Sequence, residues 1–259
     1  RALQYVKAFN GIILNHPHDK HIAGNGQIHE GRVSTRLGMK GIPALSEELM
    51  LQRDIELLDY SNSRLHVHNI STVESVSLIR RAKDRGLRIT ASVAADNLAF
   101  IEEDVSKFDT NLKILPPLRA SSDRTALKKG LSDGTIDFVC SNHVPLEREA
   151  KFLEFPYAKF GAIALQTAVA SSIESMKEHL SVEQMIEKWA YGSRKALSLS
   201  VPIIKKGEKA NLTLFDPNRV WEVSSSTLYS KSKNSSFTGK ELRGKTILNI
   251  NKGRIWKAD

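Results

Sequence analysis

Short β-rich runs alternate with helical patterns through the first 200 residues, and this alternation is the feature that most constrains the fold. A helix between consecutive strands is typical of parallel sheets, because a parallel neighbour is reached only through a long crossover. The runs predict four buried strands, at 11–15, 65–69, 87–93 and 136–141. The fourth is apolar apart from Asp137, as strands buried on both faces tend to be. The sequence therefore predicts an α/β protein built on a parallel sheet.

Helical patterns occupy the stretches between and after these strands. They predict a helix starting near Ser46 and further helices at 73–85, 122–131, 163–179 and 182–197. After Ser200 the pattern changes to strands at 210–216 and 246–250, joined by a Ser- and Lys-rich stretch at 224–239 that we expect to be a surface loop. We therefore expect two domains, an α/β domain over 1–205 and a small β domain over 206–259.

Four clear βα units are half of an eight-unit barrel. A parallel barrel is a closed sheet, and four strands alone leave two open edges. The chain is therefore either a different, open α/β fold or a piece of something longer, and its motifs decide between these.

The net basic charge is compatible with nucleic-acid binding, but the distribution of the charge argues against this function. Lys and Arg number 38 against 29 Asp and Glu, a formal net charge of +9. Residues 201–259 hold twelve basic and five acidic residues, so +7 of that charge lies in this part of the chain. No basic stripe with interleaved aromatic residues accompanies this charge, and no zinc-finger, RRM or KH motif occurs. Solvated surface is the favoured interpretation, with nucleic-acid binding through this basic C-terminal region as an alternative.

Cysteine usage and hydropathy narrow the class of protein further. Cys140 is the one cysteine, which excludes an internal disulfide framework and a cysteine-rich zinc site; inside a buried strand it is expected to be inert. No run approaches the roughly 18 apolar residues of a membrane span. The first ten residues carry no signal-peptide apolar core. We expect a cytoplasmic protein.

Polar residues cluster where three of the predicted strands end. Asn15 and His16 follow the first, His68 and Asn69 end the second, and Asn142 and His143 follow the fourth. In parallel α/β folds, ligands and catalytic groups gather at the carboxyl ends of the strands. Three such ends in one chain favour a functional site there. Asp96, by contrast, is assigned to a loop.

The motifs around these ends resemble class I dihydroorotase, a family of the amidohydrolase superfamily. The similarity runs in the family's order through His16-Pro17-His18-Asp19-Lys20, Gly38-Met39-Lys40-Gly41-Ile42-Pro43, Ile70-Ser71-Thr72, Leu115-Pro116-Pro117-Leu118-Arg119, Asn142-His143-Val144-Pro145, Lys151, Phe160-Gly161 and Ala210-Asn211-Leu212. It covers essentially the whole chain, and the motif set is specific.

The resemblance implies a (β/α)8 TIM-type barrel with a zinc pair at the carboxyl strand ends. The family closes N-carbamoyl-aspartate to dihydroorotate in pyrimidine biosynthesis and runs the reverse hydrolysis. Its metals activate a bridging hydroxide and polarise the amide carbonyl, while an aspartate on the last strand shuttles the proton. Under this resemblance, 1–205 is a partial barrel with strands five to eight, and 206–259 is the C-terminal part of the small β domain. The His-x-His ligands of the first strand and the ligand of the fourth are then expected before Arg1.

Under this resemblance, the chain keeps one of the family's metal ligands and carries other residues at most of the remaining site positions. His16 matches the fifth-strand ligand, whereas Asn69 occupies the sixth-strand ligand position and Asn142 the position of the proton-shuttling aspartate. Among the substrate contacts, Leu115 and Leu146 replace the family's Asn and His, while the Phe160-Gly161 backbone matches. His68 does not substitute for Asn69 under strict alternation, because successive strand side chains point to opposite faces.

Four replacements together indicate lost catalysis. The leading hypothesis is a dihydroorotase-like protein with an impaired or absent zinc site and a structural role. Aspartate transcarbamoylase or another pyrimidine-pathway enzyme is the expected partner, and a homodimer is also expected. The alternative from the same residues is a working dihydroorotase or related cyclic amidohydrolase, with His16 as a ligand.

Overall fold

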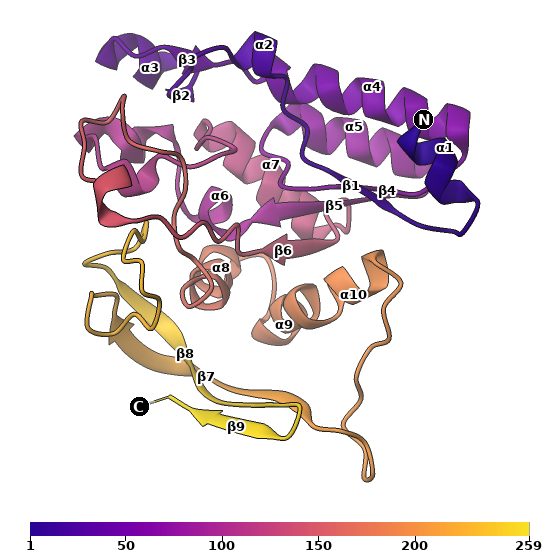
Figure 1. Cartoon of the computed structure of the whole chain (residues 1–259), viewed down its shortest axis with the longest axis vertical. Helices are drawn as coiled ribbons and strands as arrows, with labels where there is room; N and C mark the ends of the chain where they lie inside the picture. Colours follow the sequence, from indigo (N-terminus) through magenta and orange to yellow (C-terminus); the bar gives the residue numbers. More distant parts are fainter. Residues whose placement is uncertain (259) are drawn as a thin grey trace.

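The computed structural model describes residues 1–258, and its larger sheet is parallel (Figure 1). Four strands pair in the order β1-β4-β5-β6. They are β1 (Ile13–Asn15), β4 (Leu65–Val67), β5 (Ile89–Ala94) and β6 (Phe138–Cys140). Each overlaps one of the four predicted runs, so the predicted parallel sheet is confirmed. All four carboxyl ends lie at the same edge of the sheet, because the strands are parallel.

Three helices that connect these strands pack side by side, with α5 between the other two (Figure 1). They are α4 (Leu45–Ser61), α5 (Val73–Asp84) and α7 (Ser121–Ser132). Thr72 begins α5 as its N-cap, since its Oγ1 accepts a hydrogen bond from the Ser75 N–H at 3.0 Å. The apolar positions of α4 and α5 face the sheet, as the 3.6-residue period predicts.

The two helices predicted after residue 160 are shorter than their patterns. The first is α8 (Ala168–Met176), and the second divides into α9 (Val182–Ala190) and α10 (Gly192–Ala196). A Cβ on Gly192 would lie 2.7 Å from the Asp137 carbonyl oxygen, so the chain turns here to let its backbone approach β6. Before α8, Ile163 instead donates its N–H to the Asn234 carbonyl at 2.9 Å. Tertiary contacts therefore override the helical pattern at both places.

Several short elements were not predicted. They are α1 (Ala2–Lys7), α2 (Lys20–Ala23), β2 (Ile28–His29), α3 (Arg32–Leu37), β3 (Gly41–Ile42), α6 (Ala95–Ala99) and the 3-10 turns Glu102–Lys107, Thr110–Leu112 and Arg148–Ala150. Segments of two to six residues are too short to show a period. The assignment of Asp96 to a loop is wrong: it lies in α6 and is 2% exposed.

The second sheet is antiparallel, in the order β7-β8-β9. It consists of β7 (Asn211–Glu222), β8 (Glu241–Asn251) and β9 (Arg254–Lys257). Helices α8, α9 and α10 lie between the two sheets (Figure 1).

The stretch 224–239 between β7 and β8 is only in part the surface loop expected from its composition, because Leu228 and residues 234–237 are buried. Leu228 and Phe237 are each 5% exposed, and the Phe237 ring lies 4.8 Å from that of Phe100. Ser236 Oγ donates to Asp96 Oδ2 at 3.0 Å, so a polar side chain is buried with a partner. The loop thus packs back onto the α/β part of the chain.

Two hydrophobic clusters form the core. One lies between the parallel sheet and its helices, with Leu51, Leu58, Leu65, Ile79, Leu98 and Leu131 among its most buried members. The other joins the loops beside the sheet to the second sheet through Ile28, Phe100, Ile114, Phe155, Trp221 and Phe237. Across residues 1–258, no helix has both the length and the apolar character to cross a membrane.

Candidate functional site

The polar residues predicted at the strand ends meet at the carboxyl edge of the parallel sheet. Asn69 and Asn142 follow β4 and β6, and the Asn69 Nδ2 donates to the Asn142 Oδ1 at 3.1 Å. Cys140 Sγ donates to the Asn69 Oδ1, and Asn142 Nδ2 donates to the Leu115 carbonyl at 3.1 Å. These three bonds form a continuous chain from β6 through both amides to the loop at Leu115.

Backbone geometry makes asparagine suitable at both amide positions. Asn69 has φ +57 and Asn142 has φ +50, in the left-handed region that Asn tolerates better than other non-glycine residues. Because each strand ends immediately before this turn, the two side chains point across the sheet edge toward one another. Burial raises the pKa of the Cys140 thiol to about 12, so it is an un-ionised donor to this chain.

Three histidines surround the amide pair without converging on one point. His16 Nδ1 lies 3.0 Å from the His68 carbonyl oxygen, and its ring stacks on that of His18 with centroids 6.1 Å apart. His68 Nδ1 lies 3.3 Å from Ser92 Oγ. Burial lowers the pKa of His68, and His16 lowers it further. His143 is directed elsewhere, since its Nδ1 accepts the Ala164 N–H at 3.0 Å.

The donors at this edge do not by themselves match a zinc pair. Zinc is bound by imidazole, thiolate and carboxylate groups. Here the expected positions supply the His16 imidazole and two neutral amides, whose oxygens already accept hydrogen bonds from Cys140 and Asn69. Within residues 1–258, no three His, Cys, Asp or Glu side chains gather as a metal site.

Three of the four expected substrate positions, Leu146, Phe160 and Gly161, lie in the loops beyond β6, whereas Leu115 lies at the amide pair. Leu146 donates its backbone N–H to Asn234 Oδ1 at 3.3 Å, and Asn234 Nδ2 donates to the Gly161 carbonyl at 3.2 Å. Gly161 has φ +138, and a Cβ there would lie 2.5 Å from Val144 Cγ1, so only glycine fits. The Phe160 ring lies 4.9 Å from Lys113 Nζ. The structure thus brings Leu146, Phe160 and Gly161 together through Asn234.

Sequence reasoning missed several residues that organise this region. Lys113 is 2% exposed and Lys151 is 7% exposed, and neither received a role. A lone Lys within the apolar run around residues 112–115 is the signal that could have indicated a buried cation. Asn234 and Ser92 left no signal, because Ser and Asn are common in exposed loops.

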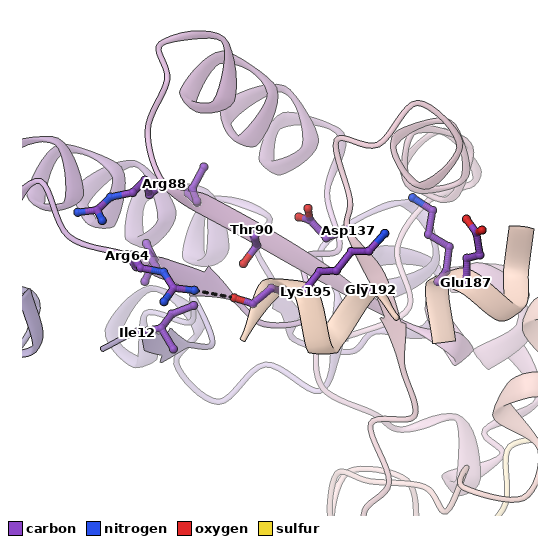
Figure 2. A pocket seen from close by; sticks show the side chains of 12 residues that line it. Ile12, Arg64, Arg88, Thr90, Asp137, Glu187, Gly192 and Lys195 are labelled. Atoms are coloured by element: carbon purple, nitrogen blue, oxygen red, sulfur yellow. Dashed lines mark hydrogen bonds between the residues drawn. The ribbon is translucent and has the colours of Figure 1, made fainter. Parts of the chain in front are cut away.

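A hollow lies at the opposite, amino end of the sheet, and its charged side chains stabilise the fold (Figure 2). Arg64 reaches across it and donates from Nη2 to the Ala196 carbonyl at 3.1 Å. Arg88 Nη2 donates to the Asn62 carbonyl at 2.5 Å. Asp137 pairs with Lys83 at 2.9 Å. These charged groups already have protein partners, and the predicted site lies at the other end of the strands.

Comparison with known proteins shows which sequences this chain is similar to. No family model matches the chain. A dihydroorotase from Syntrophus aciditrophicus is 36% identical over 256 residues, which are 98% of this chain and 60% of that protein. A dihydroorotase from Pelotomaculum thermopropionicum is 38% identical over 261 residues, which are 100% of this chain and 61% of that protein. The chain is a homologue of the dihydroorotases. It spans about 60% of the length of these curated relatives.

Solved structures show the fold class of this dihydroorotase homologue. L-hydantoinase (dihydropyrimidinase) from Arthrobacter aurescens superposes with a TM-score of 0.81 at 23% identity, over 98% of this chain and 58% of that one. D-hydantoinase from Bacillus sp. AR9 gives a TM-score of 0.80 at 19% identity, with the same coverage. The fold is therefore that of the corresponding part of these hydantoinases, a partial (β/α)8 barrel with a β domain, as predicted.

Proposed function

We propose that this dihydroorotase homologue does not perform the zinc-dependent ring closure and acts instead as a structural partner of another enzyme. The observation that carries the proposal is the hydrogen bond between Asn69 and Asn142. These are the positions at which the family resemblance implies a metal ligand and a proton-shuttling carboxylate.

Neutral amides cannot perform the chemistry expected at these positions. An amide neither takes up nor releases a proton near neutral pH, so Asn142 cannot serve as a general base. Asn69 is 2% exposed and bonds to both Asn142 and Cys140, so turning its oxygen toward a metal would break the chain. The strand ends are tied by hydrogen bonds where the family's chemistry needs ionisable donors.

The maintained framework supports a structural role. Arg119 is 4% exposed and donates to Ser71 Oγ at 3.1 Å and to the Ile42 carbonyl at 2.9 Å, and it lies 3.7 Å from Glu47. Such a buried ionic network holds the loops around the strand ends in one arrangement. Aspartate transcarbamoylase, or another enzyme of pyrimidine biosynthesis, is the proposed partner, and a homodimer is the second assembly to test.

Turnover and zinc content of the full-length protein test the proposal. We expect no dihydroorotase activity above background in either direction with zinc supplied, no stoichiometric zinc, and no effect of His16→Ala on either measurement. Circular dichroism establishes that the assayed protein is folded. Co-elution with aspartate transcarbamoylase in gel filtration supports the partner role. Activity that disappears in His16→Ala overturns the proposal.

One observation favours the alternative of a working site. Histidines that bind metals commonly direct their second ring nitrogen at a carbonyl oxygen, and His16 Nδ1 lies 3.0 Å from the His68 carbonyl. This leaves His16 Nε2 with its lone pair for a ligand. Stoichiometric zinc that is lost in His16→Ala, and retained in the matched surface variant His21→Ala, would establish this alternative.

A further inference from the structure

A cavity of about 1080 Å³ opens among the loops beside the parallel sheet. Three segments line it: the turn at 110–111, the loop at 145–152 and the loop at 225–234. Its lining holds four cationic side chains and one carboxylate: Arg148, Lys151, Lys231, Lys233 and Glu147. Of the positions discussed above as site residues, Leu146, Lys151 and Asn234 belong to it, and His16, Asn69 and Asn142 do not. It is thus distinct from the amide pair.

Two buried ammonium groups give this region positive charge that the protein does not neutralise. Lys151 Nζ donates to the carbonyls of Lys159 at 2.9 Å and Gly161 at 3.0 Å. Lys113 Nζ donates to the carbonyls of Phe155 at 2.8 Å and Pro156 at 3.0 Å. Within residues 1–258, neither ammonium forms an ion pair with a carboxylate. Burial lowers the pKa of each to about 8; for Lys151 the nearby Lys113 lowers the pKa further, and Asp109 offsets only part of the shift.

The carboxylate in the lining does not offset this charge. Glu147 Oε1 lies 3.9 Å from Lys159 Nζ, and both side chains are about two-thirds exposed, at 68% and 66%. Glu147 is therefore paired with a cation of its own at the surface. The net charge left around the cavity is positive.

Two cations in the lining remain available for a ligand. The Arg148 guanidinium lies 5.3 Å from the centre of the Phe152 ring, which orients it while leaving its N–H donors unused by the described protein atoms. Lys231 forms no hydrogen bond or ion pair within the part of the chain that the structure describes. Lys233, by contrast, donates to the Leu228 carbonyl at 2.6 Å. Ser225 and Ser232 add hydroxyl groups from the same loop.

We propose that this cavity binds a small anion carrying two or more negative charges, held by Arg148 and Lys231 and by the hydroxyls of Ser225 and Ser232. Guanidinium and ammonium groups at one cavity recognise phosphate and carboxylate oxygens, and the buried lysines contribute favourable potential without touching the ligand. Organic phosphates and polycarboxylates share this chemistry. The site does not depend on the state of the amide pair, so it stands or falls separately from the proposed function.

Calorimetric titration of the full-length protein at low ionic strength tests this site. Pyrophosphate and citrate are the two probes, with acetate as a singly charged control. Arg148→Gln and Lys231→Gln each weaken binding by about five- to tenfold, since each removes one charge-assisted contact from a partly solvated site. The matched control is Lys7→Gln, which removes the same charge from the exposed helix α1 outside the cavity.

The outcomes separate the two ligand classes and the null case. Stronger binding of pyrophosphate assigns the cavity to organic phosphates, and stronger binding of citrate assigns it to polycarboxylates. The site is refuted if neither probe binds, if acetate binds as tightly, or if Lys7→Gln weakens binding as much as the cavity variants. Circular dichroism of each variant confirms that a lost signal does not come from unfolding.

Discussion

The amide pair yields a prediction whose size follows from the structure. Asn142→Ala leaves the Asn69 Nδ2 donor without its acceptor, and Asn69 is 2% exposed. An unpaired buried donor costs about 1 to 3 kcal/mol. Ala at φ +50 adds about 1 kcal/mol, because Asn tolerates left-handed backbone better than Ala does. We predict that Asn142→Ala lowers the free energy of unfolding by about 3 kcal/mol.

A double-mutant cycle isolates the hydrogen bond from the backbone effect. Asn69→Ala breaks the same bond, so the two single substitutions should be less than additive by about 1 kcal/mol. Urea unfolding followed by circular dichroism measures all four proteins. Asn218→Ala, at an exposed position of β7, is the control and should stay within about 0.5 kcal/mol of the parent protein. Additive effects, or a loss for Asn142→Ala as small as that of the control, refute a stabilising amide pair.

Three further predictions concern stability. Burial raises the pKa of Asp96 from 3.8 to about 6, so the folded state holds this proton more tightly and stability should fall as the pH rises through that interval; Asp96→Asn should remove this dependence in unfolding curves at successive pH values. Leu58→Ala should cost about 2 to 5 kcal/mol because Leu58 is 1% exposed, whereas Leu57→Ala, next to it and 46% exposed, should cost far less in the same urea assay. Arg119→Ala should cost about 3 to 5 kcal/mol by leaving Glu47 buried without its cation, and Glu47→Gln should recover part of that loss in the double variant.

The parallel sheet could be predicted because its signal is local. Each strand is a short apolar run bounded by a turn, and residues 73–85 show a helical period, so α5 (Val73–Asp84) was predicted to within one residue. The sequence predicted one long helix at 182–197, and this prediction was wrong. The helix is interrupted near Gly192, which packs closely against Asp137. That contact joins residues far apart in the chain, and a local pattern cannot contain it.

The sequence predicted which residues belong to the candidate site, but it did not predict the hydrogen bonds between them. Polar residues at three strand ends identified the edge where Asn69 and Asn142 meet. Their direct hydrogen bond, and the Cys140 thiol that joins it, depend on a left-handed turn after each strand. The buried part of the stretch 224–239 was not predicted, for the opposite reason. Its Ser and Lys content is typical of surface, but Ser236 is buried because Asp96 satisfies its hydroxyl.

The loop between β7 and β8 also affects how the protein unfolds. Phe237 and Leu228 belong to the same hydrophobic cluster as Phe100 and Ile114, which are on the other side of the chain's midpoint in sequence. Opening the second sheet, or moving the loops beside the parallel sheet, would expose this shared cluster, so these two parts should lose amide-exchange protection in one cooperative event. Protease nicking within the irregular stretch at 201–209 should accordingly leave two fragments that remain associated and melt together.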